Sequence, residues 1–162
     1  MEASRVTQRY HQSRFTPDSR RDLLWQTLWR AFFCHRVPKN GCVLDVGCGY
    51  GQFINNVVAR RRIAIDSWPG FASHLVPGVE AITGDVTDLS MIEDSAVDFA
   101  FASNLFEHLT QSQLASALLE LSKKLAPAGR REVPTTATPQ QAYTSPSRQR
   151  HHPERSLLPW IV

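Results

Sequence analysis

A short apolar run followed directly by three spaced glycines constrains the fold of this chain more than any other feature. Residues 42–46 read CVLDV, and residues 47–51 continue as GCGYG. A short apolar run is typical of a strand that is buried on both faces of a parallel sheet. Glycines after such a strand permit the tight turn into a helix and let a ligand lie against the backbone. The segment therefore predicts an α/β domain with a ligand site at the carboxyl end of its first strand.

Strand and helix patterns alternate along the chain. Strands are predicted at residues 42–46, 62–65, 79–82 and 97–102, and helices at 16–35, 50–60 and 110–124. Thr16 is the candidate cap of the first helix, and Thr110 and Gln113 form a capping box for the last one. This alternation is typical of a parallel sheet with right-handed crossovers. We expect a Rossmann-like α/β fold with about four strands, flanking helices and a preceding N-terminal helix.

The spacing of apolar residues predicts which face of each helix meets the sheet. The inward residues are expected to be Leu24, Trp25, Leu28, Trp29, Ala31 and Phe32 in the first helix, Phe53, Ile54, Val57 and Val58 in the second, and Leu114, Leu118, Leu121 and Leu125 along the last.

Composition changes at Arg130. Five arginines and two glutamates follow Gly129, and they account for the whole net charge of +3, so the first 129 residues are neutral. Residues 130–162 also hold five of the ten prolines and show neither a helical nor a strand period. We expect a flexible arm over 1–15, a folded domain over 16–129 and a disordered tail over 130–162.

These features exclude several functional classes. A neutral folded part makes nucleic acid an unexpected partner, and no apolar run approaches the roughly 20 residues of a membrane helix. The three cysteines, Cys34, Cys42 and Cys48, lack the spacing of a metal site. We expect reduced thiols in a cytoplasmic protein, and no metal.

A polar residue lies in or after each predicted strand. Asp45 stands two places before the first glycine, Asp66 ends the second strand, and Asn104 follows the fourth. Open α/β sheets bind ligands at the carboxyl ends of their strands. Asp66 can accept two hydrogen bonds from ribose hydroxyls, while Asp85 and the backbone N–H of Val86 can bind an adenine ring. Asn104 can contact the amino-acid part of such a ligand.

Glycine spacing distinguishes two classes of ligand. Gly47, Gly49 and Gly51 are spaced as G-x-G-x-G, whereas the dinucleotide fingerprint G-x-G-x-x-G places a pyrophosphate on a helix N-terminus. Asp45 beside the turn would repel a phosphate but suits a ligand that carries an ammonium and a sulfonium group. The residues favour S-adenosylmethionine as cofactor, and a nicotinamide-dependent oxidoreductase remains an alternative.

Five segments follow one another between about residues 41 and 129, and they read VLDVGCGYG, AIDSWP, GDVTDLS, DFAFASNLFEHL and LAPAG. In this order and spacing they resemble the motifs of class I S-adenosylmethionine-dependent methyltransferases of the type 11 group. The resemblance implies cofactor contacts at Asp45, Gly47, Gly49, Gly51, Asp66, Asp85, Val86 and Asn104. It also implies methyl transfer to a small-molecule, lipid or sugar acceptor.

His108 is the candidate catalytic residue. Methyl transfer from a sulfonium chiefly needs alignment of donor and acceptor, but an oxygen or nitrogen acceptor can also need a general base. His108 lies near the predicted cofactor edge, with Glu107 beside it. The alternative is a histidine at a helix start whose hydrogen bond is only structural.

Members of this family continue after an L-x-P-x-G turn with a fifth strand. Residues 125–129 reach that turn, but Pro134 removes a hydrogen-bond donor from the segment that follows. We therefore expect an incomplete sheet with exposed apolar surface near its fourth strand and last helix. Truncation, a frame shift or an alternative exon near Arg130 would explain this pattern. An inactive, methyltransferase-like remnant is accordingly an alternative function.

Overall fold

The computed structural model of this chain describes residues 19–127. Within them, four parallel strands form one sheet in the order β3-β2-β1-β4. The strands are β1 (Cys42–Val46), β2 (Arg61–Asp66), β3 (Glu80–Thr83) and β4 (Phe99–Ala102). The α-helices are α2 (Ser19–Ala31) and α3 (Gln111–Lys124), and the 3₁₀ helices are η1 (Phe33–His35), η2 (Ile54–Asn56), η3 (Pro69–His74) and η4 (Phe106–His108). The predicted Rossmann-like sheet of four strands is confirmed.

The winding of the sheet reverses beside β1. The chain moves outward from β1 to β2 and β3, and then returns across β1 to form β4 on the other side. In the register of the sheet, Val46 lies opposite Ile65 of β2 and Ala102 of β4. The three strands thus end at one edge, next to the reversal where open α/β sheets bind ligands.

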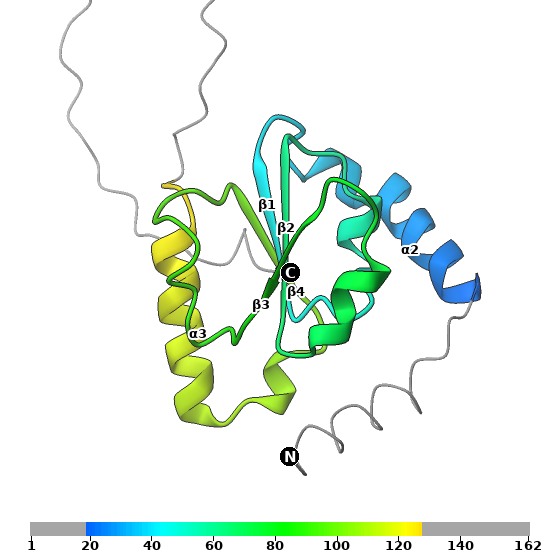
Figure 1. Ribbon diagram of the computed structural model, residues 1–162. Coiled ribbons are helices and arrows are strands. Elements are labelled where there is room, and N and C mark those ends of the chain that lie inside the picture. Colours follow the sequence, from blue (N-terminus) through cyan, green and yellow to red (C-terminus); the bar gives the residue numbers. More distant parts are fainter. Residues whose placement is uncertain (1–18, 128–162) are drawn as a thin grey trace, which may run out of the picture.

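Helices cover both faces of the sheet, with α3 on one side and α2 on the other (Figure 1). Successive residues of a strand point to opposite faces. Leu44 of β1 accordingly packs in a cluster with Ala117 and Leu121 of α3. Its neighbour Val43 packs in a second cluster, on the side of α2.

Aromatic rings fill the layer beneath α2. Phe53 is stacked on Phe101 of β4, with 3.9 Å between the ring centroids. Trp25 of α2 meets Phe101 edge-on at 5.8 Å, and Phe33 meets it edge-on at 5.5 Å. Such aromatic pairs stabilise packing beyond the area that they bury. They fix α2 over the carboxyl-terminal half of β4.

The inward face of α2 is narrower than predicted. Trp25, Leu28 and Trp29 pack against the aromatic layer, whereas Leu24 is 54% exposed and Phe32 is 39% exposed. The three inward residues follow the i, i+3, i+4 spacing of one helix face. Leu24 lies beside that face, Ala31 is also exposed, and Phe32 follows the last helical residue. The predicted cap at Thr16 lies outside the described residues.

The predicted helix over 50–60 is wrong, because the segment forms only η2. Val57 already has an extended backbone, with φ −70° and ψ 133°, and Val58 is 60% exposed instead of buried. The expected inward positions Phe53, Ile54 and Val57 are buried. The chain must reach the start of β2 at Arg61, at the opposite edge of the sheet. Residues 57–60 have no helical structure and lead directly from η2 into β2.

α3 begins at the predicted capping box. The Thr110 hydroxyl oxygen accepts a hydrogen bond from the Gln113 backbone N–H at 3.3 Å, and the Thr110 N–H donates to the Gln113 side chain at 2.9 Å. The buried residues of the helix are Ala117, Leu121 and Lys124. The inward position predicted for Leu118 is wrong, since this side chain is 40% exposed. Ala117 takes the sheet-facing position because its small side chain lets the helix approach the strands.

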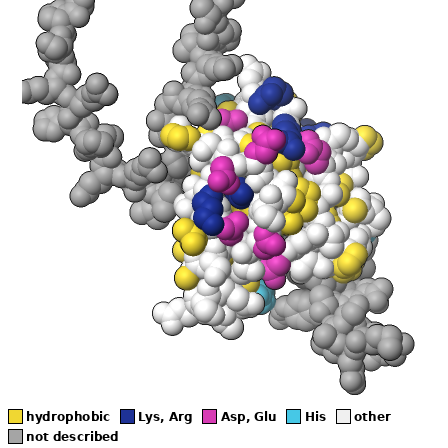
Figure 2. Space-filling view, turned by 60° about the vertical axis from the view of Figure 1, so that its left-hand side comes forward, with side chains coloured by type: hydrophobic (Ala, Val, Ile, Leu, Met, Phe, Trp, Pro, Cys, Tyr) yellow, Lys and Arg dark blue, Asp and Glu magenta, His cyan; other side chains and the backbone are white. Residues whose placement is uncertain are grey.

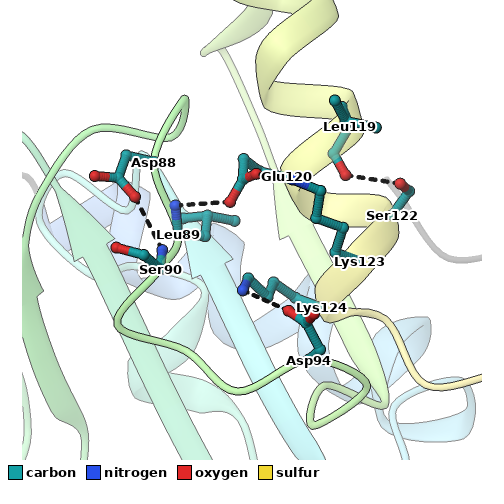
Figure 3. A network of polar contacts seen from close by, with 9 residues as sticks. All are labelled: Asp88, Leu89, Ser90, Asp94, Leu119, Glu120, Ser122, Lys123 and Lys124. Atoms are coloured by element: carbon teal, nitrogen blue, oxygen red, sulfur yellow. Dashed lines mark hydrogen bonds and ion pairs between the residues drawn. The ribbon is translucent and has the colours of Figure 1, made fainter.

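Polar contacts join α3 to the loop between β3 and β4 (Figure 3). Lys124 Nζ lies 2.6 Å from Asp94 Oδ1, and the Leu89 backbone N–H donates to Glu120 Oε2 at 3.2 Å. After the helix, Leu125 forms a parallel bridge with Val97 ahead of β4. The arm predicted over 1–15, the tail over 130–162 and the interrupted fifth strand all lie outside the described residues.

Candidate functional site

A cavity of about 690 Å³ lies at the carboxyl ends of the strands. This volume is in the range of small-molecule sites in proteins. Among its lining residues are Asp45, Gly47, Gly49, Asp66, Asp85, Val86, Asn104 and His108. The structure thus brings the predicted site residues to one place, except Gly51, which does not line the cavity.

Asp66 is held at the end of β2 by backbone groups. Its Oδ2 accepts a hydrogen bond from the Gly49 N–H, and its Oδ1 accepts one from the Trp68 N–H, both at 2.8 Å. The residue is only 9% exposed. Each carboxylate oxygen has two lone pairs, so each can accept a further hydrogen bond from a ligand in the cavity. This arrangement suits a pair of adjacent hydroxyl groups.

Asp45 lies deeper, in the middle of the sheet, and is 2% exposed. Burial, together with the nearby charge of Asp66, raises the pKa of its carboxyl group to about 8, although the hydrogen bond from the Ile54 backbone N–H acts in the opposite direction. Burial also raises the pKa of the Cys48 thiol, and the charges of Asp45 and Asp66 act in the same direction. A cation in the cavity would favour the charged form of Asp45.

Two glycines of the turn play different parts. Gly49 has φ +52°, and a Cβ added there would meet no atom within 4 Å. Its backbone therefore borders open space in the cavity. Gly51 has φ +66°, and a Cβ there would lie 2.5 Å from Leu75 Cδ2. Gly51 thus shapes the turn from outside the cavity.

Residues 43–129 match the family model of a methyltransferase domain. This chain belongs to that family.

Solved structures of methyltransferases have the same fold. One is an S-adenosylmethionine-dependent methyltransferase from Archaeoglobus fulgidus, with a TM-score of 0.55 and 22% identity over 65% of this chain and 48% of that one. A second is phosphoethanolamine N-methyltransferase 1 from Haemonchus contortus in complex with phosphoethanolamine and S-adenosylhomocysteine, with a TM-score of 0.60 and 19% identity over 77% and 30% of the two chains. A third is the N-methyltransferase NodS from Bradyrhizobium japonicum with S-adenosylhomocysteine, with a TM-score of 0.52 and 19% identity over 67% and 56%. This chain spans about half the length of the first of these structures or of NodS, and less of the second. No curated protein matches the sequence significantly.

The loop after β3 gives the methyltransferase domain its third acidic position. Asp85 Oδ1 accepts hydrogen bonds from the Thr87 backbone N–H and the Thr87 hydroxyl, both at 2.8 Å. Val86 is buried, at 6% exposure. These contacts hold the carboxylate of Asp85 and the backbone of Val86 at the border of the cavity.

Asn104 and His108 lie after β4, across the cavity from Asp66. Asn104 has φ +53°, and its side-chain amide donates to the Ser103 hydroxyl at 3.2 Å. His108 ends η4, where its backbone N–H donates to the Leu105 carbonyl at 3.0 Å. The His108 side chain is exposed. Within residues 19–127 the His108 imidazole makes no hydrogen bond. The alternative, a histidine with a structural hydrogen bond, therefore finds no partner for its side chain among these residues.

Other residues of the cavity wall were not predicted from the sequence. Arg21 and Trp25 of α2, together with Tyr50 in the glycine turn, also line the cavity. The Tyr50 ring lies 5.2 Å from that of Trp68 and 4.6 Å from that of His74, centroid to centroid. The sequence does hold one signal for this part of the wall. Arg21 lies four residues before Trp25, so it falls on the apolar face of the predicted helix, where a charged residue is unusual.

Three further findings concern the described part of the domain. The described residues contain no group of three or more His, Cys, Asp or Glu side chains that could hold a metal ion. None of its helices is long and apolar enough to cross a membrane. All three cysteines are free thiols.

Proposed function

We propose that the cavity binds S-adenosylmethionine and that the chain transfers its methyl group to a small acceptor molecule. The observation that carries this proposal is the carboxylate of Asp66, presented at the end of β2 by the N–H of Gly49 in a domain of the methyltransferase family. Two structures with the same fold are complexes with S-adenosylhomocysteine, which is the product of the donor.

The residues of the cavity fit the parts of this donor. The two oxygens of Asp66 would accept the ribose hydroxyls. Asp85 and the Val86 backbone N–H would bind the adenine edge, and the open side of Gly49 would let the amino-acid part pass close to the backbone. Asp45 below the turn would stabilise a positively charged ligand.

The same geometry argues against a nicotinamide dinucleotide. Dinucleotide sites place the pyrophosphate at the N-terminus of a helix that follows the glycine turn. Here the turn leads only into η2, which has three residues. So short a helix supplies little dipole for a phosphate.

When bound, the donor supplies an activated methyl group on sulfur. The contribution of the protein is to align the two reactants and to exclude water. His108 and Glu107 of η4 line the same cavity. For an oxygen or nitrogen acceptor, His108 would accept the proton that the acceptor loses.

We infer a small-molecule acceptor, with lipids and sugars included, rather than a nucleic acid. The face shown in Figure 2 carries acidic and basic side chains next to one another instead of a continuous basic area. Nucleic-acid binding depends on such a basic area. The phosphoethanolamine bound by one protein of the same fold is an example of a small acceptor.

Calorimetric titration of the full chain with S-adenosylhomocysteine tests the donor site. The wild type should bind, and Asp66→Asn should weaken binding by roughly tenfold or more, because it removes charge-assisted hydrogen bonds while one acceptor oxygen remains. Glu93→Gln changes an exposed carboxylate outside the cavity and should leave affinity unchanged.

Binding of NADH and an assay of methyl transfer distinguish the proposed function from its two alternatives. Binding of NADH without S-adenosylhomocysteine would support the oxidoreductase instead. Binding of neither would support the inactive remnant. Where the donor binds, transfer of a labelled methyl group to a panel of amines, sugars and lipids tests turnover, and His108→Ala should lower the rate without weakening donor binding.

A further inference from the structure

The two arginines at the start of β2 belong to opposite faces of the sheet, because successive residues of a strand point to opposite sides. Further along β2, Ile63 packs in the cluster with α3, and Ala64 packs in the cluster with α2. Arg61 therefore lies on the side of α3, where it forms an ion pair with Glu80 at 2.8 Å. Arg62 lies on the other side, which α2 shares with η2 and η3 (Figure 1).

The segment between η2 and β2 turns alternate side chains toward solvent. Ala59 packs against the cluster on the side of α2, whereas Val58 is 60% exposed and Arg60 is also exposed. Val58 and Arg60 therefore point outward together. The Nε of Arg60 donates a hydrogen bond to the Asn40 carbonyl at 3.1 Å. This contact brings Arg60 next to Lys39, in the connection between η1 and β1.

Arg62 joins this segment to the residues that follow η3. Its guanidinium donates hydrogen bonds to the Val57 carbonyl at 3.5 Å and to the Pro77 carbonyl at 3.1 Å. Val58 is the next residue after Val57, and Val76, which is 39% exposed, comes just before Pro77. An exposed valine thus lies on each side of Arg62.

These side chains form one region, which we call the basic–apolar surface and define as Arg36, Lys39, Val58, Arg60, Arg62 and Val76. None of its four basic residues forms an ion pair with another residue of 19–127. The carboxylate of Asp98, near Gly41, accepts the backbone N–H of Cys42 at 2.7 Å instead. The positive charges of the surface are therefore available to a partner.

We propose that the basic–apolar surface binds an anionic lipid bilayer. Each Lys or Arg close to such a bilayer raises affinity about fivefold, and exposed aliphatic side chains add apolar burial at the level of the headgroups. The valines favour a bilayer over a nucleic acid, because they offer no ring on which a base can stack. The cavity lies at the carboxyl ends of the strands and this surface lies toward their amino ends, so the cavity stays open.

Titration of the full chain with vesicles tests this proposal. The wild type should bind vesicles of phosphatidylcholine mixed with phosphatidylserine, but not vesicles of phosphatidylcholine alone. The double variant Lys39→Gln/Arg60→Gln should bind the anionic vesicles roughly twentyfold more weakly. Val58→Ser should weaken binding roughly three- to tenfold, because it removes apolar area from the contact. Arg61→Gln is the matched control, since it removes the same charge on the side of α3, and it should bind like the wild type.

Three results would overturn the assignment. They are equal binding of the wild type to both kinds of vesicle, binding to neither, and equal affinity of the wild type and the double variant for the anionic vesicles. Weaker binding of the double variant with no effect of Val58→Ser would overturn it in favour of a soluble polyanion, which titration with duplex DNA and with polyglutamate would identify.

A single substitution keeps the proposal testable if the double variant does not fold. Lys39→Glu then replaces it, because the exposed side chain of Lys39 forms no ion pair within residues 19–127. Reversal of this charge should weaken binding to the anionic vesicles roughly twentyfold, and an unchanged affinity would overturn the assignment. None of these measurements involves the methyl donor, so their outcome is independent of the proposed function.

Discussion

The carboxylate of Asp66 accepts a hydrogen bond of 2.8 Å from the backbone N–H of Gly49, which joins the end of β2 to the turn after β1. Gly49 makes this bond in a left-handed conformation, with φ +52°. Most side chains avoid that conformation. The position of the carboxylate thus depends on a glycine 17 residues away.

Alanine substitutions at Gly49 and Gly51 should separate ligand binding from stability. Gly49→Ala should cost about 1–2 kcal/mol of unfolding free energy, because only the left-handed backbone is strained. It should also weaken binding of S-adenosylhomocysteine, since the new methyl group enters the open side of the turn. Gly51→Ala adds a 2.5 Å clash with Leu75 Cδ2, so it should cost about 1–3 kcal/mol more.

Urea unfolding and calorimetric titration of both variants measure the two effects. Gly51→Ala should be the less stable protein, but it should bind with nearly the wild-type affinity under conditions where it is folded. The reverse ranking in binding would place the ligand on the other side of the turn.

Asp45 should make the stability of the chain decrease as pH rises. Burial raises the pKa of its carboxyl group to about 8 in the folded protein, whereas an unfolded aspartate has a pKa of about 3.9. Between these values the folded state keeps a proton that the unfolded state has lost. The free energy of unfolding should therefore fall by up to about 1.4 kcal/mol per pH unit over this interval, and level off above it.

The substitution Asp45→Asn isolates the contribution of Asp45 to the pH dependence of stability. Asp45→Asn is neutral at every pH, so its urea-unfolding midpoints should vary less between about pH 5 and about pH 8. Affinity of the wild type for S-adenosylmethionine should rise over the same interval, because the cation favours the charged carboxyl group. Identical pH profiles for the wild type and Asp45→Asn would show that Asp45 is not the source of the pH dependence of stability.

Most of the sheet was predictable because its strands are short apolar runs that end in polar residues or glycine. The helix over 50–60 was not, since the spacing of Phe53, Ile54 and Val57 fits both a helix and a compact turn with three buried side chains. The fourth strand starts at Phe99 rather than at Val97, because Val97 pairs with Leu125 across the chain.

The candidate site was predictable where it depends on strand ends. Asp66 stands at such an end, and its place follows from the order of strand and turn. Arg21 could not be assigned in that way, because a charged residue in a helix is expected to face solvent. Its place at the cavity depends on how Trp25 packs against Phe101, which is a contact between segments far apart in sequence.

Lys124 should stabilise the chain more through its stem than through its charge. The residue is 5% exposed, and its partner Asp94 has a side chain that is 67% exposed (Figure 3). Lys124→Met keeps an apolar stem and should cost less than about 1 kcal/mol, whereas Lys124→Ala leaves a gap and should cost about 2 kcal/mol or more. Thermal and urea unfolding measure the stability of both Lys124 variants. Lys123→Met is the control, because the side chain of Lys123 is half-exposed. Equal losses for the two Lys124 variants would make the ion pair the main contribution.

The two faces of α3 should respond differently to substitution. Leu121 is 1% exposed and packs with β1 residues such as Leu44, so Leu121→Ala should cost about 2–5 kcal/mol of unfolding free energy. Leu118 and Leu119 are 40% and 58% exposed. Gln at either position should change the free energy by less than about 0.5 kcal/mol and should reduce self-association, because the exposed apolar area becomes smaller. Urea unfolding and sedimentation measure the two quantities. A loss of about 2 kcal/mol for Leu119→Gln would contradict this prediction, since a side chain that costs so much must be covered in the folded chain.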